Sequence, residues 1–385
     1  MVTLDWLGKF LQLPERFLSS SPGPGGAVIQ GSAGESAIVI LLAATRRAQR
    51  RKAGSDEFAL TIGGDEGATD VGREQCVVYC SDQTHTIIKK ACMVLGLRCR
   101  PLPTSAADGF ALRGATACAA IEEDLKVGLL PVALVGTSGT TTSCAFDPLD
   151  ELADVSAATG LWLHVDAAYG GAYACLDELR AKFRGLDRCD SFCVNAHKKL
   201  LIPFDLAALY VADRRPLLAA LALTPEYLRN HASESGAVVD FEHWQLGLGR
   251  RFRALKLWFV LRRFGTTGIR NHVRRGMQLA DSFGRRVEAS SALELAVPVS
   301  LSLVCFRCVP LDAAVAPPGS EQDDALQARL LEAVKSAGIF IIHSKLGGVK
   351  ILRLACGGVE QQQRDVDTAF SVIEAEALKI RAASA

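Results

Sequence analysis

Short apolar runs alternate with amphipathic stretches along the first two thirds of the chain. The clearest apolar runs are residues 77–80, 132–135, 161–165, 192–194 and 207–211. Each run is continuous, which is typical of strands that are buried on both faces of a parallel sheet. Helical patterns separate these runs, so the sequence predicts an α/β fold built on a largely parallel sheet.

The first clear helix signal lies near the N-terminus. We expect this helix to start within residues 31–36, to continue through apolar residues to Ala44 and to end in the basic cluster 46–52. Basic side chains stabilise a helix C-terminus, which supports this end point. The Gly- and Asp-rich residues 63–72 are expected to form a surface loop.

The pattern changes in the last third of the chain. Long amphipathic helices are expected there, most clearly at residues 252–264, and a region of mixed strands and helices follows, with a loop at residues 313–320. We therefore expect a large domain over residues 1–290 and a smaller α+β domain over residues 291–385.

Composition and charge narrow the class of partner. Lys and Arg number 43 against 42 Asp and Glu, a formal net charge of +1, so nothing indicates nucleic acid or an anionic membrane. The longest apolar runs fall short of the roughly 20 residues that span a bilayer. The N-terminus lacks the residue order of a secretory signal, which favours a cytoplasmic location. A small molecule is the expected partner.

The cysteines do not indicate a disulfide framework or a metal site. All twelve are scattered, mostly within apolar stretches, where thiols act as small core side chains. Cys305 and Cys308 have the spacing of a zinc-ligand pair, but they lie in a strand-like run without a second pair nearby. We expect no metal.

Two strand-like runs are followed by residues that can carry chemistry. Asp166 ends one run and Lys198 lies shortly after another; ligands of open α/β sheets bind beyond the carboxyl ends of strands. A lysine amine can form a Schiff base with the aldehyde of pyridoxal phosphate (PLP), while a carboxylate keeps its pyridine nitrogen protonated. On position alone, Asp166 equally suits a helix cap, and an exposed lysine pair is usually a solvated surface.

PLP also carries a phosphate, which binds well at helix N-termini. Residues 31–36 supply one, with glycines that permit close approach and with two serine hydroxyls. The threonines of residues 139–142 add hydroxyls at the same sheet edge, and His85 could stack on the pyridine ring. Each of these features alone is commonly structural. The glycine spacing does not fit the G-x-G-x-x-G pattern of dinucleotide sites.

Taken together, the segments resemble the group II PLP-dependent decarboxylases, specifically the aromatic-L-amino-acid, tyrosine and tryptophan decarboxylases. The matching segments are 5–9, 28–32, 81–85, 139–142, 164–169, 195–198, 240–245 and 248–253. The resemblance implies a type I PLP-dependent transferase fold with a mostly parallel seven-stranded sheet. It also implies a homodimer with shared active sites.

The resemblance implies a role for each matching residue. Lys198 would hold the cofactor, Asp166 would pair with the pyridine nitrogen, and His85 would stack on the ring. Ala168 would lie under the ring, where only a small side chain fits. The residues expected at or beside the phosphate are Ala33, Gly34, Thr141, Asn195 and His197.

Two further matches concern the reaction and the substrate. Tyr227 matches the tyrosine of the family's mobile catalytic loop and would protonate the substrate α-carbon after loss of CO2; a surface aromatic is the alternative. Relatives that make aldehydes typically replace this tyrosine or the stacking histidine, so retention of Tyr227 and His85 favours an amine product. Gly249 matches a pocket position at which glycine leaves room for a large aromatic ring. We expect a tryptophan-, dopa- or tyrosine-like substrate.

Three departures from the family pattern keep alternatives open. The family's N-terminal helical segment, which precedes the motif at Trp6, is expected to be absent. Gly34 stands where relatives carry serine, and Lys199 stands where they carry tryptophan. An active decarboxylase is the leading hypothesis, and an aromatic aldehyde synthase or a truncated non-catalytic paralogue remains an alternative.

Overall fold

The computed structural model describes residues 1–55, 72–222, 239–312 and 314–383, which form two compact units. Unit 1 comprises Met1–Thr104, Ala111–Gly139 and Phe146–Thr266, and unit 2 comprises Ser105–Phe110, Thr140–Ala145 and Thr267–Ala385. The loop expected at residues 63–72 lies outside the described residues, apart from Gly72. The domain boundary expected at residue 290 stays a prediction, because compactness alone divides the chain elsewhere, at Thr266.

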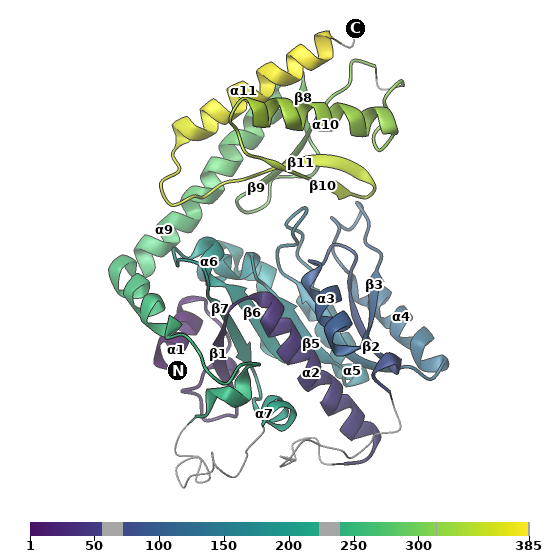
Figure 1. The fold of residues 1–385 in the computed structure, drawn as a ribbon, viewed down its shortest axis with the longest axis vertical. Helices are drawn as coiled ribbons and strands as arrows, with labels where there is room; N and C mark the ends of the chain where they lie inside the picture. Colours follow the sequence, from purple (N-terminus) through teal and green to yellow (C-terminus); the bar gives the residue numbers. More distant parts are fainter. Residues whose placement is uncertain (56–71, 223–238, 313, 384–385) are drawn as a thin grey trace. The chain divides into compact units, whose positions relative to one another are not determined.

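Unit 1 is built around a seven-stranded sheet of order β1-β7-β6-β5-β4-β2-β3 (Figure 1). The strands are β1 (Gly26–Gln30), β2 (Cys76–Ser81), β3 (Arg98–Leu102), β4 (Leu130–Thr137), β5 (Trp162–Asp166), β6 (Ser191–Asn195) and β7 (Ala207–Val211). β7 pairs antiparallel with both of its neighbours, and the other pairs are parallel. All strands except β7 therefore end at the same edge.

The apolar runs of the sequence all became strands of this sheet, so the predicted α/β fold is confirmed. Two strands escaped prediction for physical reasons. β1 begins with Gly26 and directly follows Pro- and Gly-rich residues, which favour a loop. β3 lies at the sheet edge, carries Arg98, Arg100 and Pro101, and is only partly buried. An edge strand of this kind lacks a continuous apolar run.

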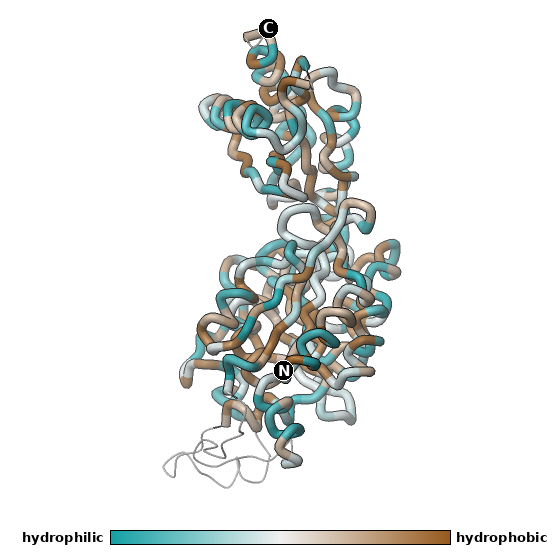
Figure 2. Tube along the Cα trace, turned by 90° about the vertical axis from the view of Figure 1, so that its right-hand side faces the viewer, coloured by the Kyte–Doolittle hydropathy of each residue, from teal (hydrophilic) through white to brown (hydrophobic). Residues whose placement is uncertain are grey.

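Helices cover both faces of the sheet (Figure 1). α2 (Ala33–Lys52), α3 (Ile87–Leu95) and α7 (Arg215–Leu221) share one hydrophobic core with strand residues such as Val28, Val78 and Leu209. α4 (Gly114–Lys126) and α5 (Leu149–Thr159) pack together against β4 on the other face, and α1 (Val2–Phe10) lies beside β1. In Figure 2, hydrophobic stretches run through the interior of the part that carries the N-terminus.

Shorter helical segments connect these elements. The 3-10 helices are Glu15–Phe17, Arg73–Gln75, Gly170–Cys175, Asp177–Phe183, Leu186–Arg188 and Phe241–Trp244, and α6 is the four-residue helix Ala196–Lys199. Among the described ranges, no helix combines the length and the apolar character needed to cross a bilayer.

A long helix, α9 (Arg253–Ala289), is interrupted at Gly265. The backbone there has φ 61° and ψ 179°, a conformation that is open to glycine and strained for other residues. The helix predicted at residues 252–264 is therefore confirmed up to this break. The boundary between the two units follows one residue later.

Unit 2 contains a four-stranded antiparallel sheet of order β10-β11-β9-β8. Its elements are β8 (Leu293–Leu295), β9 (Leu303–Cys308), α10 (Glu321–Ser336), β10 (Ile342–Leu346), β11 (Val349–Ala355) and α11 (Gln363–Ala382). The ring of Phe283 in α9 lies 5.4 Å from Phe306 and 5.7 Å from Phe370, which joins α9 to β9 and α11 in one core. The predicted mixture of strands and helices in the C-terminal region is confirmed.

A buried ion pair in unit 2 supports a first prediction. The Asp323 carboxylate is fully buried and accepts hydrogen bonds from Arg307, from Gln327 Nε2 at 3.0 Å and from the Gly319 N–H at 2.9 Å. Arg307→Met would leave this carboxylate without its cation. We expect the free energy of unfolding, measured in urea, to fall by about 3 to 5 kcal/mol.

Lys335→Met provides the matched control. Lys335 forms an i,i+3 pair with the exposed Glu332, so its loss should cost less than about 1 kcal/mol. An equal loss of unfolding free energy in the two variants would show that the buried pair contributes no more to stability than the exposed pair.

Candidate active site

The strand ends bring most of the predicted site residues to one edge of the sheet in unit 1. The strands that end at this edge do so at Gln30, Ser81, Leu102, Thr137, Asp166 and Asn195. Strand pairing places Thr137 opposite Asp166, and Asp166 opposite Cys193. The spacing of these positions is therefore set by the buried sheet and not by loops.

Asp166 is buried at the end of β5, with 4% of its surface exposed. Its Oδ1 accepts a hydrogen bond from the Ala168 N–H at 3.0 Å, and its carbonyl accepts one from the Ser138 N–H at 2.9 Å. The next helical segment starts at Gly170 with Tyr169 as its N-cap and no side-chain cap. The helix-cap role is therefore wrong for Asp166, which lies at the edge where the parallel strands end.

The two lysines of α6 differ in their surroundings. Lys198 is exposed, whereas Lys199 is 8% exposed and places its Nζ 5.4 Å from the centroid of the Tyr169 ring. A cation at this distance from an aromatic face is attracted to it. Lys198 is thus the lysine whose amine is accessible to a ligand.

His85 is influenced by both members of the proposed pair. Burial is the main cause that lowers the pKa of His85; the Asp166 carboxylate raises it and the Lys198 ammonium lowers it. Both charges therefore lie close enough to act on the imidazole. Its Nδ1 accepts a hydrogen bond from the Ile87 N–H at 3.1 Å, which places the proton of the neutral ring on Nε2.

The N-terminus of α2 contains two of the residues predicted to bind the phosphate. Ala33 and Gly34 form its first turn, and Ser32 caps it by accepting a hydrogen bond from the Glu35 N–H at 3.2 Å. The first N–H groups of a helix have no partner within it and attract anions. At the end of β6, the side-chain Oδ1 of Asn195 is buried without a hydrogen-bond partner.

His197 also lies in the turn after β6, but one of its nitrogens is already engaged. Its Nδ1 lies 2.9 Å from both the N–H and the carbonyl oxygen of Leu206. Burial is the largest cause that lowers the pKa of His197. Only Nε2 is left to face a ligand.

Two predicted residues cannot be placed with this group. Tyr227 lies outside the described residues. Thr141 belongs to unit 2, where it is exposed and its carbonyl oxygen accepts a hydrogen bond from Arg353. The roles predicted for both residues stay predictions.

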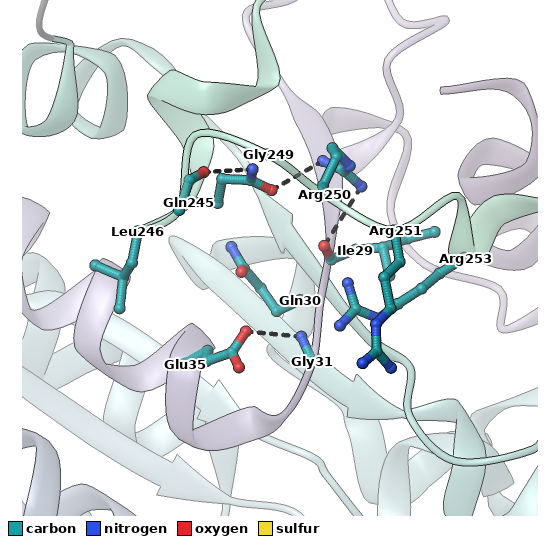
Figure 3. Close-up of a pocket in the computed structure, with 11 residues that line it drawn as sticks. Ile29, Gln30, Gly31, Glu35, Gln245, Leu246, Gly249, Arg250, Arg251 and Arg253 are labelled. Carbon is teal, nitrogen blue, oxygen red and sulfur yellow. Dashed lines mark hydrogen bonds between the residues drawn. The ribbon is translucent and has the colours of Figure 1, made fainter.

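Gly249 lines a cavity of about 370 Å³ in unit 1 (Figure 3). The cavity lies beside the end of β1 and the start of α2, and a Cβ at Gly249 would meet no atom within 4 Å. Arg250 donates hydrogen bonds to Gln245 Oε1 at 3.3 Å and to the Ile29 carbonyl at 3.4 Å. The structure thus places Gly249 beside open space near the end of β1 and the start of α2, and its predicted role at the substrate stays a prediction.

Sequence reasoning missed a carboxylate that supports this edge. Asp147 is almost fully buried and accepts hydrogen bonds from the N–H groups of Leu112 and Thr137, both at 2.7 Å. Burial raises the pKa of Asp147 to about 7. The Thr137 hydroxyl in turn contacts Thr84 at 3.1 Å, next to His85. No sequence pattern marks Asp147, because its partners are distant in the chain.

A buried histidine beneath the site supports a prediction on acid stability. Burial lowers the pKa of His164 to about 4, from an ordinary value of 6.5, and its Nδ1 lies 2.8 Å from Ser191 Oγ. Between these pH values the unfolded chain binds a proton that the folded chain does not. The stabilisation is therefore complete above pH 6.5 and falls by up to about 3 kcal/mol as the pH drops to 4.

The test compares the unfolding free energies of wild type and His164→Asn across this pH range. Taking the difference between the two proteins cancels the contributions of other titrating groups to stability. One of these is Asp147, whose raised pKa makes stability rise as the pH falls. The advantage of wild type should shrink as the pH falls. A difference that does not change with pH would contradict the prediction.

Comparison with known proteins defines the family. Residues 1–309 match the family model described as the pyridoxal-dependent decarboxylase conserved domain. The chain belongs to the pyridoxal-dependent decarboxylase family. This confirms the resemblance seen in the sequence and assigns PLP as the cofactor.

Several relatives of this chain are named for different activities within the family. Tyrosine decarboxylase 2 of Narcissus pseudonarcissus is 40% identical over 100% of this chain and 73% of its own length. Phenylacetaldehyde synthase of Arabidopsis thaliana is 39% identical over 98% of this chain and 73% of its own. A crystal structure of Oryza sativa TDC with PLP and tryptamine superposes with a TM-score of 0.90 at 37% identity, covering 99% of this chain and 75% of that one.

Proposed function

We propose that the protein decarboxylates an aromatic L-amino acid, tryptophan-, dopa- or tyrosine-like, to the corresponding amine and CO2. The observation that carries the proposal is that the buried Asp166 ends β5, that the exposed Lys198 closely follows the end of its paired strand β6, and that both charges act on His85. The names of relatives that match nearly the whole chain support an aromatic substrate.

The residues at the sheet edge fit PLP. The first turn of α2 offers N–H groups to the phosphate, and Asn195, whose Oδ1 has no hydrogen-bond partner, can turn its NH2 group toward the same anion. Ala168 has a small side chain that would tolerate a ring packed against it, and Asp166 can pair with the protonated pyridine nitrogen. Lys198 would hold the cofactor covalently.

When bound, PLP acts as an electron sink for the bond that breaks at the substrate α-carbon. The side chains have separate tasks around it. The Asp166 carboxylate would stabilise the protonated pyridine nitrogen, and the neutral imidazole of His85 would stack on the pyridine ring. Tyr227 would deliver a proton to the α-carbon, and this step decides between an amine and an aldehyde product.

Gly34 offers a direct test of the phosphate position. A Cβ at Gly34 would lie 3.4 Å from Ser32 Oγ and 3.9 Å from Ile87 Cγ2, which is ordinary contact. Gly34→Ser should therefore fit and add one hydroxyl donor. We expect PLP to bind about two- to tenfold more tightly, equivalent to 0.5 to 1.5 kcal/mol, in a fluorescence titration.

Gly34→Ala is the matched control, since it adds the Cβ without the hydroxyl. If the serine and alanine variants bind PLP with equal affinity, the phosphate does not contact residue 34.

An aromatic aldehyde synthase is the second candidate, because relatives named as aldehyde synthases match the chain as well as the decarboxylases do. The experiment incubates the PLP-loaded protein with dopa, tryptophan, tyrosine, phenylalanine and histidine, and identifies products by mass spectrometry. Amine without hydrogen peroxide supports the proposal. Aldehyde with hydrogen peroxide supports the synthase, and no product from any substrate supports the non-catalytic paralogue.

We further propose that the protein acts as a homodimer in the cytosol. Unit 1 exposes Phe204, Phe252, Leu255 and Phe259 around a cavity of about 310 Å³, and exposed apolar patches of this kind commonly mark protein interfaces. All twelve cysteines are free thiols, as is typical of reducing compartments. Sedimentation analysis would test the dimer.

A further inference from the structure

Lys199 is a charged residue in a buried position next to the proposed catalytic lysine. It is 8% exposed, whereas the preceding Lys198 is exposed. In a helical turn, successive side chains point about 100° apart, so one amine can face a ligand while the other packs into the protein. A buried ammonium is unfavourable unless other groups compensate for its lost water.

The Tyr169 ring provides part of that compensation. Lys199 Nζ lies 5.4 Å from the Tyr169 ring centroid, within the range of cation–π attraction, which strengthens when water is excluded. Tyr169 itself is held by Tyr173, with ring centroids 5.8 Å apart and hydroxyl oxygens 3.4 Å apart. The cation therefore meets a ring whose position is fixed.

Backbone contacts make the turn around Tyr169 rigid. The Gly170 N–H donates to the Ser138 carbonyl at 3.1 Å, and the Asn195 N–H donates to the Ala168 carbonyl at 3.2 Å. Ala168 in turn donates to Asp166 Oδ1 at 3.0 Å. Tyr169 is thus three residues from Asp166 on a turn that cannot shift without breaking these bonds.

The contact between Lys199 and Tyr169 joins the turn after β6, which carries Lys198, to the turn after β5, which follows Asp166. We propose that Lys199 is a positioning residue: through Tyr169 it fixes the turn of Lys198 against the turn of Asp166, and it adds a positive charge next to Lys198 in the sequence. The inference rests on the proposed PLP chemistry, in which Lys198 and Asp166 hold different parts of one ring system and their separation must match it.

The first test does not depend on PLP. The cofactor-free protein is treated with a limiting amount of an amine-acetylating reagent, and acetylation of each lysine is followed by peptide mass spectrometry. Lys198 should react at least about tenfold faster than Lys199, because only Lys199 is buried. Tyr169→Leu should raise the Lys199 rate severalfold, and Tyr169→Phe, which keeps the ring, should not. Equal rates for the two lysines in wild type would overturn the proposal.

The second test measures positioning in the PLP-loaded protein. Lys199→Met and Tyr169→Leu should each weaken PLP binding about tenfold, and the double variant should be no weaker than either, because they break one contact. Lys199→Arg should restore affinity, since it keeps the cation. The pH midpoint of the cofactor absorbance should rise in Lys199→Met and return to the wild-type value in Lys199→Arg.

A purely structural role would lower the melting temperature without moving that midpoint, and this result would overturn the proposal. So would losses of affinity that multiply in the double variant. Failure of wild type to bind PLP would instead contradict the proposed function, and the acetylation result would still decide whether Lys199 is held by Tyr169.

Discussion

Lys198→Ala should reduce decarboxylation by more than about a thousandfold, equivalent to roughly 4 kcal/mol of transition-state stabilisation. The exposed Lys198 amine is the group that can hold the cofactor, since Lys199 is buried against Tyr169. The variant should also lose the absorbance that reports the covalently bound cofactor. Steady-state rates and an absorbance spectrum after gel filtration would measure both effects.

Lys89→Ala is a suitable control, because Lys89 is exposed on α3. It should keep the wild-type rate and spectrum. Retention of the absorbance in Lys198→Ala, together with its loss in Lys199→Ala, would show that the wrong lysine has been chosen.

Asp166→Asn should lower kcat by about a hundredfold or more, or roughly 3 kcal/mol. The asparagine oxygen can still accept the hydrogen bond from the Ala168 N–H, so the fold of the turn is kept. What disappears is the negative charge that stabilises a protonated pyridine nitrogen. The same change removes the carboxylate that raises the pKa of His85, so this pKa should fall further, as measured by NMR titration.

Asp154→Asn is the matched control, since Asp154 is exposed and pairs with Arg188. Its kcat should stay within about twofold of wild type, because surface pairs contribute little. A comparable loss of activity in the two variants would contradict a specific role for Asp166.

The sequence predicts the sheet well because its strands are buried on both faces. Residues 207–211, for example, are all apolar and form the whole of β7. The same logic fails for β3, where an edge position lets Arg98 and Arg100 remain partly exposed. A continuous run of hydrophobic residues indicates a buried strand. A strand at the edge of the sheet is partly exposed, so its sequence need not show such a run.

The site is predictable to the extent that strand ends determine it. Asp166 and Asn195 end parallel strands, and parallel strands place their carboxyl ends at one edge. Asp147 and the Lys199 contact could not be foreseen, because their partners lie in other segments: Leu112 precedes α4, Thr137 ends β4, and Tyr169 follows β5. The break in α9 at Gly265 was equally hidden, since an isolated glycine within a helical pattern is usually tolerated.

The central claim is that Lys198 holds PLP, and reductive trapping tests it most directly. The protein is loaded with PLP, reduced with borohydride, digested and examined by fragment-ion mass spectrometry, which distinguishes adjacent lysines. Modification at Lys198, absent from the Lys198→Ala variant, is the expected result. Modification at Lys199, or no modified lysine at all, would contradict the account.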